Sequence, residues 1–230
     1  MFKNRSYEEE IMDDLEASGP IIPQTLKELD IINQRLGGNY VTTNGLDQLI
    51  KEAPKRQLRI ADLGCGGGDI LKLVAQWASK RGYDVDLVGF DANPHIIEYA
   101  KENCSDFPEI TFSVQDIFSD RFKSQKFDVI LCTLFTHHFH EDDLVKIFMQ
   151  FKEQANTGVI INDLHRHWLA YYSIKLLTGL FSKSEMVKND GPLSVKRAFK
   201  KPDLEQIMSR ASITKFTLKW MWAFRWQLIF

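Results

Sequence analysis

Apolar residues along the chain follow two alternating patterns. Short, nearly continuous apolar runs are typical of strands buried on both faces of a sheet. These runs are residues 58–61, 84–91, 110–114, 127–133 and 157–164. Between them, apolar residues recur at helical spacing, as in Ile70, Leu71, Val74 and Trp77. Strands that alternate with helices predict an α/β fold built on a parallel sheet.

The two ends of the chain extend this pattern. Apolar residues at helical spacing predict three helices before the first strand, over 8–16, 24–36 and 44–52. After the fifth strand, helical spacing from Trp168 to Leu180 is followed by a polar loop, 182–190, and a turn at Gly191-Pro192. A further helix is predicted from Lys201 to Met208. Residues 214–222 and 225–230 are predicted to form a closing β-hairpin, which adds two strands, one of them antiparallel.

A glycine-rich turn follows the first strand, where the sequence reads Asp62-Leu63-Gly64-Cys65-Gly66-Gly67-Gly68-Asp69. Glycine has no Cβ, so such a loop turns tightly and lets a ligand approach the backbone. A nicotinamide or flavin site would require Gly-x-Gly-x-x-Gly. Here the third glycine comes one place early, at Gly68, and the required position holds Asp69. A carboxylate there would repel a diphosphate but suits a zwitterionic sulfonium ligand.

The order acid-x-Gly-x-Gly-x-Gly resembles motif I of the class I S-adenosylmethionine (SAM) dependent methyltransferases. The chain is similar to the ubiquinone/menaquinone-type and polyketide methyltransferases, through ordered motifs over residues 40–165. The resemblance implies an α/β, Rossmann-like sheet of seven mostly parallel strands with helices on both faces and an antiparallel last strand. It also implies an N-terminal helical cap (1–56) and a SAM-binding domain (57–230) with a substrate-lid insert after strand five, at about 165–200.

The resemblance also implies which residues hold the cofactor. An acid that ends strand two, Asp91, would bind both ribose hydroxyls, because its two acceptor oxygens match two vicinal donors. An acid after strand three, Asp116, would accept from the adenine amino group, and Ile117 would flank the ring. The cofactor residues expected are Asp62, Gly64, Cys65, Gly66, Asp69, Asp91, Ala92, Asp116, Ile117, Thr133 and His138.

Composition and charge narrow the function classes. The 230 residues carry 29 Lys and Arg against 31 Asp and Glu, a net charge of -2. With no basic tail, a nucleic-acid partner is not expected. The sequence shows neither a secretory signal nor an apolar run of about 18 residues, which predicts a cytoplasmic protein without an integral membrane segment. The three cysteines lack metal-ligand spacing, so no metal site is predicted. A homodimer is left open.

Histidines cluster after two strands, at the sheet edge where open α/β folds bind ligands. Methyl transfer needs an acceptor held in line with the methyl group, and a hydroxyl acceptor gains from a neutral imidazole base. His165 is the first choice as base, with His137 and His138 as alternatives. Relatives with a similar His-His pair often place the position of His138 by the cofactor. Asp163 lies too near His165 in the chain to be assumed as its partner.

The acceptor is expected to be a small molecule. Methyltransferases that act on amino groups of nucleic acids carry Asn/Asp-Pro-Pro-aromatic after strand four, where this chain has Thr133-Leu134-Phe135-Thr136. Protein-arginine methylation would require paired glutamates, and Glu141 stands alone. An aromatic-rich insert suits a flat, apolar acceptor such as an aromatic or polyketide-like hydroxyl compound. The substrate-contacting residues expected are Tyr40, His167, Trp168 and Tyr172.

Three other functions remain open from the sequence. The first is C-methylation of a quinol ring. The second is a non-catalytic SAM-binding subunit, although decay of the glycine loop or the ribose acid would be its usual sign, and both are intact. The third is an NAD-dependent oxidoreductase.

Overall fold

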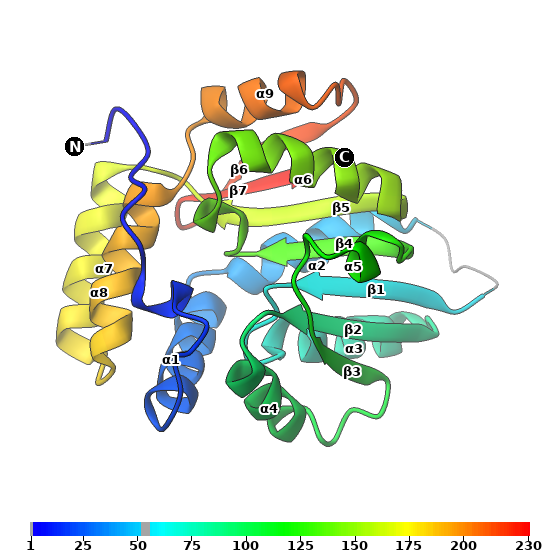
Figure 1. Cartoon of the computed structure of the whole chain (residues 1–230), viewed down its shortest axis with the longest axis horizontal. Coiled ribbons are helices and arrows are strands. Elements are labelled where there is room, and N and C mark those ends of the chain that lie inside the picture. The colour runs from blue at the N-terminus through cyan, green and yellow to red at the C-terminus, as the bar shows by residue number, and fades with distance from the viewer. Residues whose placement is uncertain (1, 52–55) are drawn as a thin grey trace.

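The computed structural model describes residues 2–51 and 56–230. In that part of the chain a seven-stranded sheet, in the order β3-β2-β1-β4-β5-β7-β6, forms the centre of the molecule (Figure 1). The strands are β1 (Leu58–Leu63), β2 (Val85–Asp91), β3 (Ile110–Val114), β4 (Phe127–Thr133), β5 (Ala155–Leu164), β6 (Thr217–Met221) and β7 (Arg225–Ile229).

The strand directions confirm the predicted mostly parallel sheet. Strands β1 to β5 pair in parallel, with β1 at the centre between β2 and β4. The last strand, β7, runs antiparallel to both β5 and β6. The switch in strand order between β1 and β4 brings the carboxyl ends of β1, β2 and β4 to one edge, which is where this fold class binds ligands.

Helices cover both faces of the sheet. They are α1 (Ile21–Arg35), α2 (Gly38–Leu49), α3 (Asp69–Arg81), α4 (Pro94–Asn103), α5 (Asp120–Lys123), α6 (Glu141–Gln154), α7 (Trp168–Phe181), α8 (Glu185–Arg197) and α9 (Lys201–Arg210), with 3-10 turns η1 (Ile11–Asp13) and η2 (Thr136–His138). Successive β1 residues face opposite layers: Ile60 packs with α2 and α3, whereas Ala61 packs with α5, α6 and α9. Burial on both faces explains why the strands are continuously apolar.

A third group of elements stands beyond the carboxyl end of the parallel strands. Helices α7 and α8 lie side by side there, and α1 lies below them (Figure 1). The N-terminal segment, residues 2–20, runs between this group and η2. It is fastened by Arg5, whose Nε donates to the Arg197 carbonyl at 2.8 Å and whose Nη2 donates to the His137 carbonyl at 3.1 Å. This arrangement covers the ligand edge of the sheet.

Two predictions about these outer elements are wrong. Residues 8–16 do not form a helix, and only the short turn η1 is present. The backbone amides of Ile11 and Met12 donate to the Asp190 carboxylate instead, at 2.9 and 3.0 Å. The polar loop predicted over 182–190 and the turn at Gly191-Pro192 are replaced by α8, which holds Pro192 in its interior.

Tertiary packing explains the continuous helix α8. An interior proline normally disfavours a helix, since it lacks an amide donor and crowds the preceding turn. Ser184 caps the start of the helix, since its hydroxyl accepts from the Val187 amide, and the helix buries Met186, Val187, Leu193 and Val195. Burial of four large apolar side chains contributes about 1.5–3 kcal/mol each and outweighs the local preference.

The helices before β1 shift relative to their predicted limits. The helix predicted over 24–36 is α1, and the one predicted over 44–52 is α2, which begins earlier. The predicted end of the latter at Glu52 lies outside the described residues. The division into a cap of residues 1–56 and a body of residues 57–230 stays a prediction, and 52–55 beside its boundary also lie outside the described residues.

Candidate active site

The carboxyl end of β1 places a buried acid at the ligand edge. Asp62 is 1% exposed, and its Oδ1 has no hydrogen-bond partner among the described residues. Burial, and then the negative charge of Asp91, raise the pKa of Asp62 to about 8. A buried carboxyl without a partner is unfavourable in its ionised form. A cationic ligand group beside Oδ1 would remove that penalty, which fits the ammonium group of an amino-acid-bearing cofactor.

The glycine loop after β1 adopts the conformation that its sequence predicts. Gly64, Gly66 and Gly68 have φ values of +66°, +50° and +78°, in the left-handed region that favours glycine. A Cβ on Gly64 would lie 2.2 Å from the Phe135 ring. Cys65, which stands between Gly64 and Gly66 in the chain, is buried. The loop therefore packs closely under the segment that follows β4, where only glycine fits.

The remaining expected cofactor residues follow the ends of β2, β3 and β4. The Asn93 amide donates to Asp91 Oδ1 at 3.0 Å, at a bend that includes Ala92. Asp116 is exposed and accepts from the Phe118 amide at 2.8 Å, whereas Ile117 is buried. These side chains line the same edge as Asp62, in chain order.

Two further members of the expected cofactor set make contacts within the protein. Asp69, the first residue of α3, accepts from Asn103 Nδ2 at 3.0 Å and pairs with Lys72 at 2.6 Å. These contacts hold the carboxylate against α4 and its own helix. Thr133 ends β4, and its hydroxyl lies 3.3 Å from that of Thr42 on α2.

A cavity of about 350 Å³ adjoins this edge. Its walls come from η1, α1, η2, α7, α8 and the β6–β7 turn. They are mostly apolar, and the ionisable residues among them are Glu10, His137, His138, Asp190 and Arg225. The expected substrate residues Tyr40, His167, Trp168 and Tyr172 are not among the lining residues, and neither is His165.

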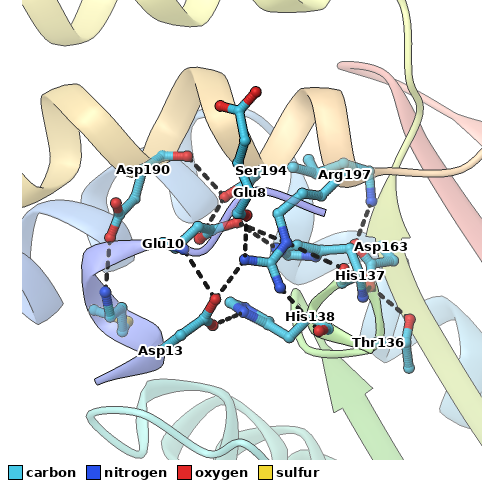
Figure 2. A network of polar contacts seen from close by, with 12 residues as sticks. Glu8, Glu10, Asp13, Thr136, His137, His138, Asp163, Asp190, Ser194 and Arg197 are labelled. Atoms are coloured by element: carbon cyan, nitrogen blue, oxygen red, sulfur yellow. Dashed lines mark hydrogen bonds and ion pairs between the residues drawn. The ribbon is translucent and has the colours of Figure 1, made fainter. Parts of the chain in front are cut away.

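His137 lies in the cavity wall and keeps one ring nitrogen on an acid (Figure 2). Its Nδ1 lies 2.7 Å from Asp163 Oδ1, and its backbone amide donates to Asp163 Oδ2 at 3.1 Å. Thr136 Oγ1 donates to the same oxygen at 2.6 Å. Burial raises the pKa of Asp163, but the charge of His137 and these hydrogen bonds outweigh it and hold that pKa well below its usual range. With Nδ1 donating to Asp163, Nε2 is the free acceptor nitrogen.

Glu10 lies next to His137 and also belongs to the cavity wall (Figure 2). Its Oε1 lies 3.6 Å from His137 Nε2, beyond hydrogen-bonding distance, and Ser194 donates to its Oε2 at 2.9 Å. Within the part of the chain that the structure describes, neither Oε1 nor Nε2 has a hydrogen-bond partner. Burial raises the pKa of Glu10 to about 7 despite the nearby charges of His138 and Arg197. Two buried polar atoms are thus left unsatisfied beside the cavity, where a polar ligand group could pair with both.

Asp13 links the N-terminal segment to His138 and Arg197. His138 Nδ1 lies 2.5 Å from Asp13 Oδ1, and Arg197 pairs with the other carboxylate oxygen (Figure 2). Partial burial raises the pKa of Asp13, but the hydrogen bonds from His138 and Arg197 hold it well below its usual range. The contacts fix His138 between the cofactor edge and the cavity.

Glu10, His137 and His138 have a spacing that could hold a cation. One ligand atom from each lies within 4.8 Å of the others. Arg197 Nε, however, lies 3.7 Å from Glu10 Oε1 and already supplies positive charge beside that carboxylate. A second cation there would meet electrostatic repulsion. The arrangement is better suited to moving a proton than to binding a metal.

The second histidine cluster lies in an aromatic environment outside the cavity lining. Trp220 Nε1 donates to His165 Nδ1 at 3.2 Å, and the His165 ring packs edge-on against Trp226. Burial lowers the pKa of His165 to about 4. Trp168 and Tyr172 are exposed on α7, and Tyr40 is exposed on α2. These contacts do not join His165 to an acid.

Sequence reasoning missed Glu10, and it left Asp163 without a partner. Glu10 falls in a stretch whose spacing resembled a surface helix, so no local signal marked it. For Asp163, the one feature in the sequence that pointed to a functional role was its position at the end of β5. Arg225 on β7 was assigned no role, although it is buried and lines the cavity.

A family model described as a methyltransferase domain matches residues 54–211. A carboxy-S-adenosyl-L-methionine synthase of Helicobacter pylori is 26% identical over 125 residues, which are 54% of this chain and 49% of that protein. The chain thus spans about half the length of the curated relatives it matches.

Solved structures share the fold at low identity. The plantazolicin methyltransferase BpumL superposes with a TM-score of 0.66 at 14% identity, over 89% of this chain and 88% of that chain. The magnesium protoporphyrin IX methyltransferase of Synechocystis gives 0.54 at 16% identity, over 86% and 85%. The methyltransferase domain of the citrinin polyketide synthase gives 0.60 at 14% identity, over 83% and 51%.

Proposed function

The chain belongs to the methyltransferase domain family, and from this premise we propose that it methylates a hydroxyl group of a small, largely apolar acceptor. The family match and the shared fold support a SAM-dependent methyltransferase of the small-molecule type. The observation that carries the finer proposal is the pairing of His137 with Asp163 at the wall of an apolar cavity.

The cofactor edge fits SAM in charge and shape. Asp62 would accept from the ammonium group, and the glycine loop lets a ligand approach the backbone. Asp91 would bind the ribose hydroxyls, and Asp116 and Ile117 the adenine. SAM supplies a methyl group that its sulfonium charge has already activated. The protein then has to hold an acceptor oxygen in line with that methyl and make its lone pair available.

His137 is the base that the geometry supports best. Its Nε2 would accept the hydroxyl proton as the oxygen–carbon bond forms. The sulfur–carbon bond breaks at the same time, its electron pair stays on sulfur, and S-adenosylhomocysteine is left. Asp163 would stabilise the imidazolium and fix its tautomer. Glu10, protonated over part of the physiological pH range, would donate a hydrogen bond to the same acceptor oxygen.

His165 competes with His137 for the role of base. It follows β5 as the sequence reasoning required, but its pKa is lowered to about 4, and it donates to no carboxylate among the described residues. We therefore place His137 first, His138 beside the cofactor, and His165 in support of the aromatic cluster. Tyr40, His167, Trp168 and Tyr172 remain proposed as contacts for parts of an acceptor that extend outside the cavity.

Several predictions about partners and location stay proposals. We propose that catalysis needs no metal and no nucleic acid, and that the protein acts in the cytoplasm. Within residues 2–51 and 56–230, none of the helices has both the length and the apolar character needed to cross a bilayer. Full activity after treatment with a chelator would support metal-free catalysis, and loss of activity restored by one divalent cation would contradict it.

The deciding experiment is transfer of an isotope-labelled methyl group. Purified protein is incubated with labelled SAM and a panel of phenols, enols, quinols, carboxylates and amines, and the products are identified by mass spectrometry. Methyl ethers of hydroxyl compounds are expected. Ring-methylated quinols would favour C-methylation. SAM binding without turnover would favour a non-catalytic subunit, and binding of NAD without SAM would favour an oxidoreductase. A carboxylated SAM product would support the chemistry that the names of the Helicobacter pylori relatives state for those proteins.

A further inference from the structure

Arg225 is a buried cation in the cavity wall. It is 2% exposed, and no carboxylate of the described residues lies within 4.0 Å of its guanidinium. In the same part of the chain, its hydrogen bond is from Nη1 to Asn162 Oδ1 at 3.2 Å, and its Nε has no partner. The side chain at this position therefore offers an unpaired donor and a positive charge that the protein itself matches only in part.

An unmatched buried guanidinium is costly. Transfer of a charge from water into an apolar interior is unfavourable unless an opposite charge or hydrogen bonds compensate it. Burial lowers the pKa of Arg225 to about 10, so the group still carries its charge near neutral pH. The negative charge of Asp163 acts the other way and raises that pKa, but among the described residues no ion pair within 4.0 Å joins the two side chains. An anionic ligand group in contact with the guanidinium would complete the compensation.

The residues around Arg225 hold its guanidinium in place. A Cβ on Gly38 would lie 2.8 Å from Arg225 Cζ, so glycine at the start of α2 leaves the necessary room. Asn162, which accepts from Arg225, is fixed in turn by donating to the Gly38 carbonyl at 2.9 Å and to Thr42 Oγ1 at 3.1 Å. Strand β7 and helix α2 thus orient the cation together.

Another part of the cavity wall is apolar and open to the surface. Leu177, Trp220 and Trp222 line it and are also 39%, 50% and 73% exposed, so they form its mouth. Helix α7 continues outward from this mouth with the exposed side chains of Leu176 and Leu180. The cavity therefore leads from a buried cation to an apolar surface.

We propose that Arg225 binds an acidic oxygen of the acceptor. The acceptor is then an amphiphile: its head carries an oxygen that ionises near neutral pH, and its apolar tail leaves the cavity between Leu177 and Trp222. The guanidinium stabilises the anion of that head, so the head loses its proton more readily in the cavity than in water. This inference deepens the proposed function and rests on it for the reaction, but not for the binding.

The test uses a chromogenic probe, an alkyl-substituted nitrophenol, whose absorbance reports its ionisation. It is titrated with pH, free and bound to the full chain in the presence of S-adenosylhomocysteine. The bound phenol is expected to have a pKa lower than the free phenol by about one unit or more, since hydrogen bonds to a charged group are strong. Arg225→Gln should abolish this shift, and Arg225→Lys should keep part of it. Arg210→Gln, which removes an exposed arginine on α9, serves as the matched control and should keep all of it.

Binding alone decides the outcome, so failure of this inference is distinguishable from failure of methyl transfer. An unchanged shift in a folded Arg225→Gln variant would overturn the proposal. Should that variant fail to fold, the native protein gives a second measurement: the nitrophenol should bind about tenfold more tightly than the alkyl nitrobenzene of the same chain length, which has no acidic oxygen. Equal affinities would also overturn it. An alkyl benzoate of the same chain length that binds as well as the nitrophenol would support the proposal and show that the site also accepts a carboxylate head.

Discussion

The proposed cofactor edge and the proposed acceptor cavity are built in different ways. Each expected cofactor residue on the edge lies at the end of a strand of the parallel sheet or a few positions after it, from Asp62 near the end of β1 to Thr133 at the end of β4. The cavity joins residues that are far apart in the chain. Ser194 and Glu10, which line it and are hydrogen-bonded, are 184 positions apart, and the Arg5–Arg197 contact that holds the N-terminal segment in place spans 192 positions.

This difference teaches where local sequence is sufficient to define a site. Parallel strands bring their carboxyl ends to one edge, so a residue's position relative to its strand also fixes its place in space. No such rule applies to the N-terminal segment, α7, α8 and the β6–β7 turn, which meet only through side-chain packing. The cofactor edge should therefore respond to backbone changes, and the acceptor cavity to single side-chain changes that affect catalysis.

The largest expected effect is on the acceptor side. His137→Ala should lower kcat by about 10²-fold or more, because the proposed base is lost while solvent remains a poor substitute. Affinity for S-adenosylhomocysteine should change little. Turnover and isothermal titration calorimetry measure the two quantities. An unchanged kcat would remove His137 from the mechanism.

Asp163→Asn provides the companion to that variant. It keeps the size of the side chain but removes the charge that stabilises a protonated His137. We expect kcat to fall, as it should in His137→Ala. The dependence of activity on pH should change as well. Loss of activity with an unchanged profile would indicate a structural role for Asp163.

A backbone change on the cofactor side comes next. Gly64→Ala should destabilise the fold by about 2–4 kcal/mol, since it combines left-handed strain with a clash against Phe135. Gly82→Ala is the matched control: its φ of +68° is nearly the same, but a Cβ there meets nothing within 4 Å. It should cost about 1 kcal/mol. Denaturant unfolding measures both, and equal losses would show that the contact with Phe135 does not matter.

Asp62→Asn separates stability from binding on the same edge. In the ligand-free protein the pKa of Asp62 is about 8, against ~3.9 when unfolded. Between those values the folded state holds a proton that the unfolded state has lost, so this group makes stability fall as pH rises from about 4 to 8. In the Asn variant, the fall in stability between about pH 4 and 8 should be smaller. The variant should also bind SAM about tenfold or more weakly. Melting temperatures at several pH values and calorimetry test this, and identical pH profiles would contradict it.

The smallest expected effect belongs to His165→Ala. If His165 only supports Trp220 and Trp226, kcat should change by less than about threefold, whereas a catalytic base would cost at least about 10²-fold. The same turnover assay used for His137→Ala measures it. A loss as large as that of His137→Ala would restore His165 as the base and make the second histidine cluster part of the site.

The sequence by itself determined the sheet and its ligand edge. Continuous apolar runs predicted the strands β1 to β5, and the limits of β3 and β4 agree residue by residue. The glycine loop was also predictable, because a positive φ at Gly64, Gly66 and Gly68 leaves few other residue choices. These features depend on neighbours in the chain, which a sequence displays directly.

Only the tertiary structure decided the acceptor side. The stretch from Glu8 to Glu16 shows helical spacing, but only the turn η1 forms there, with its first amides bound to the Asp190 carboxylate of α8. Gly191-Pro192 looks like a turn, but the packing of Met186 and Leu193 holds it inside α8. Likewise, Glu10 and Arg225 have no local signal, since their burial and missing partners arise from segments that meet only after folding. Long-range packing outweighs local preference at these positions, and so they could be read only from the folded chain.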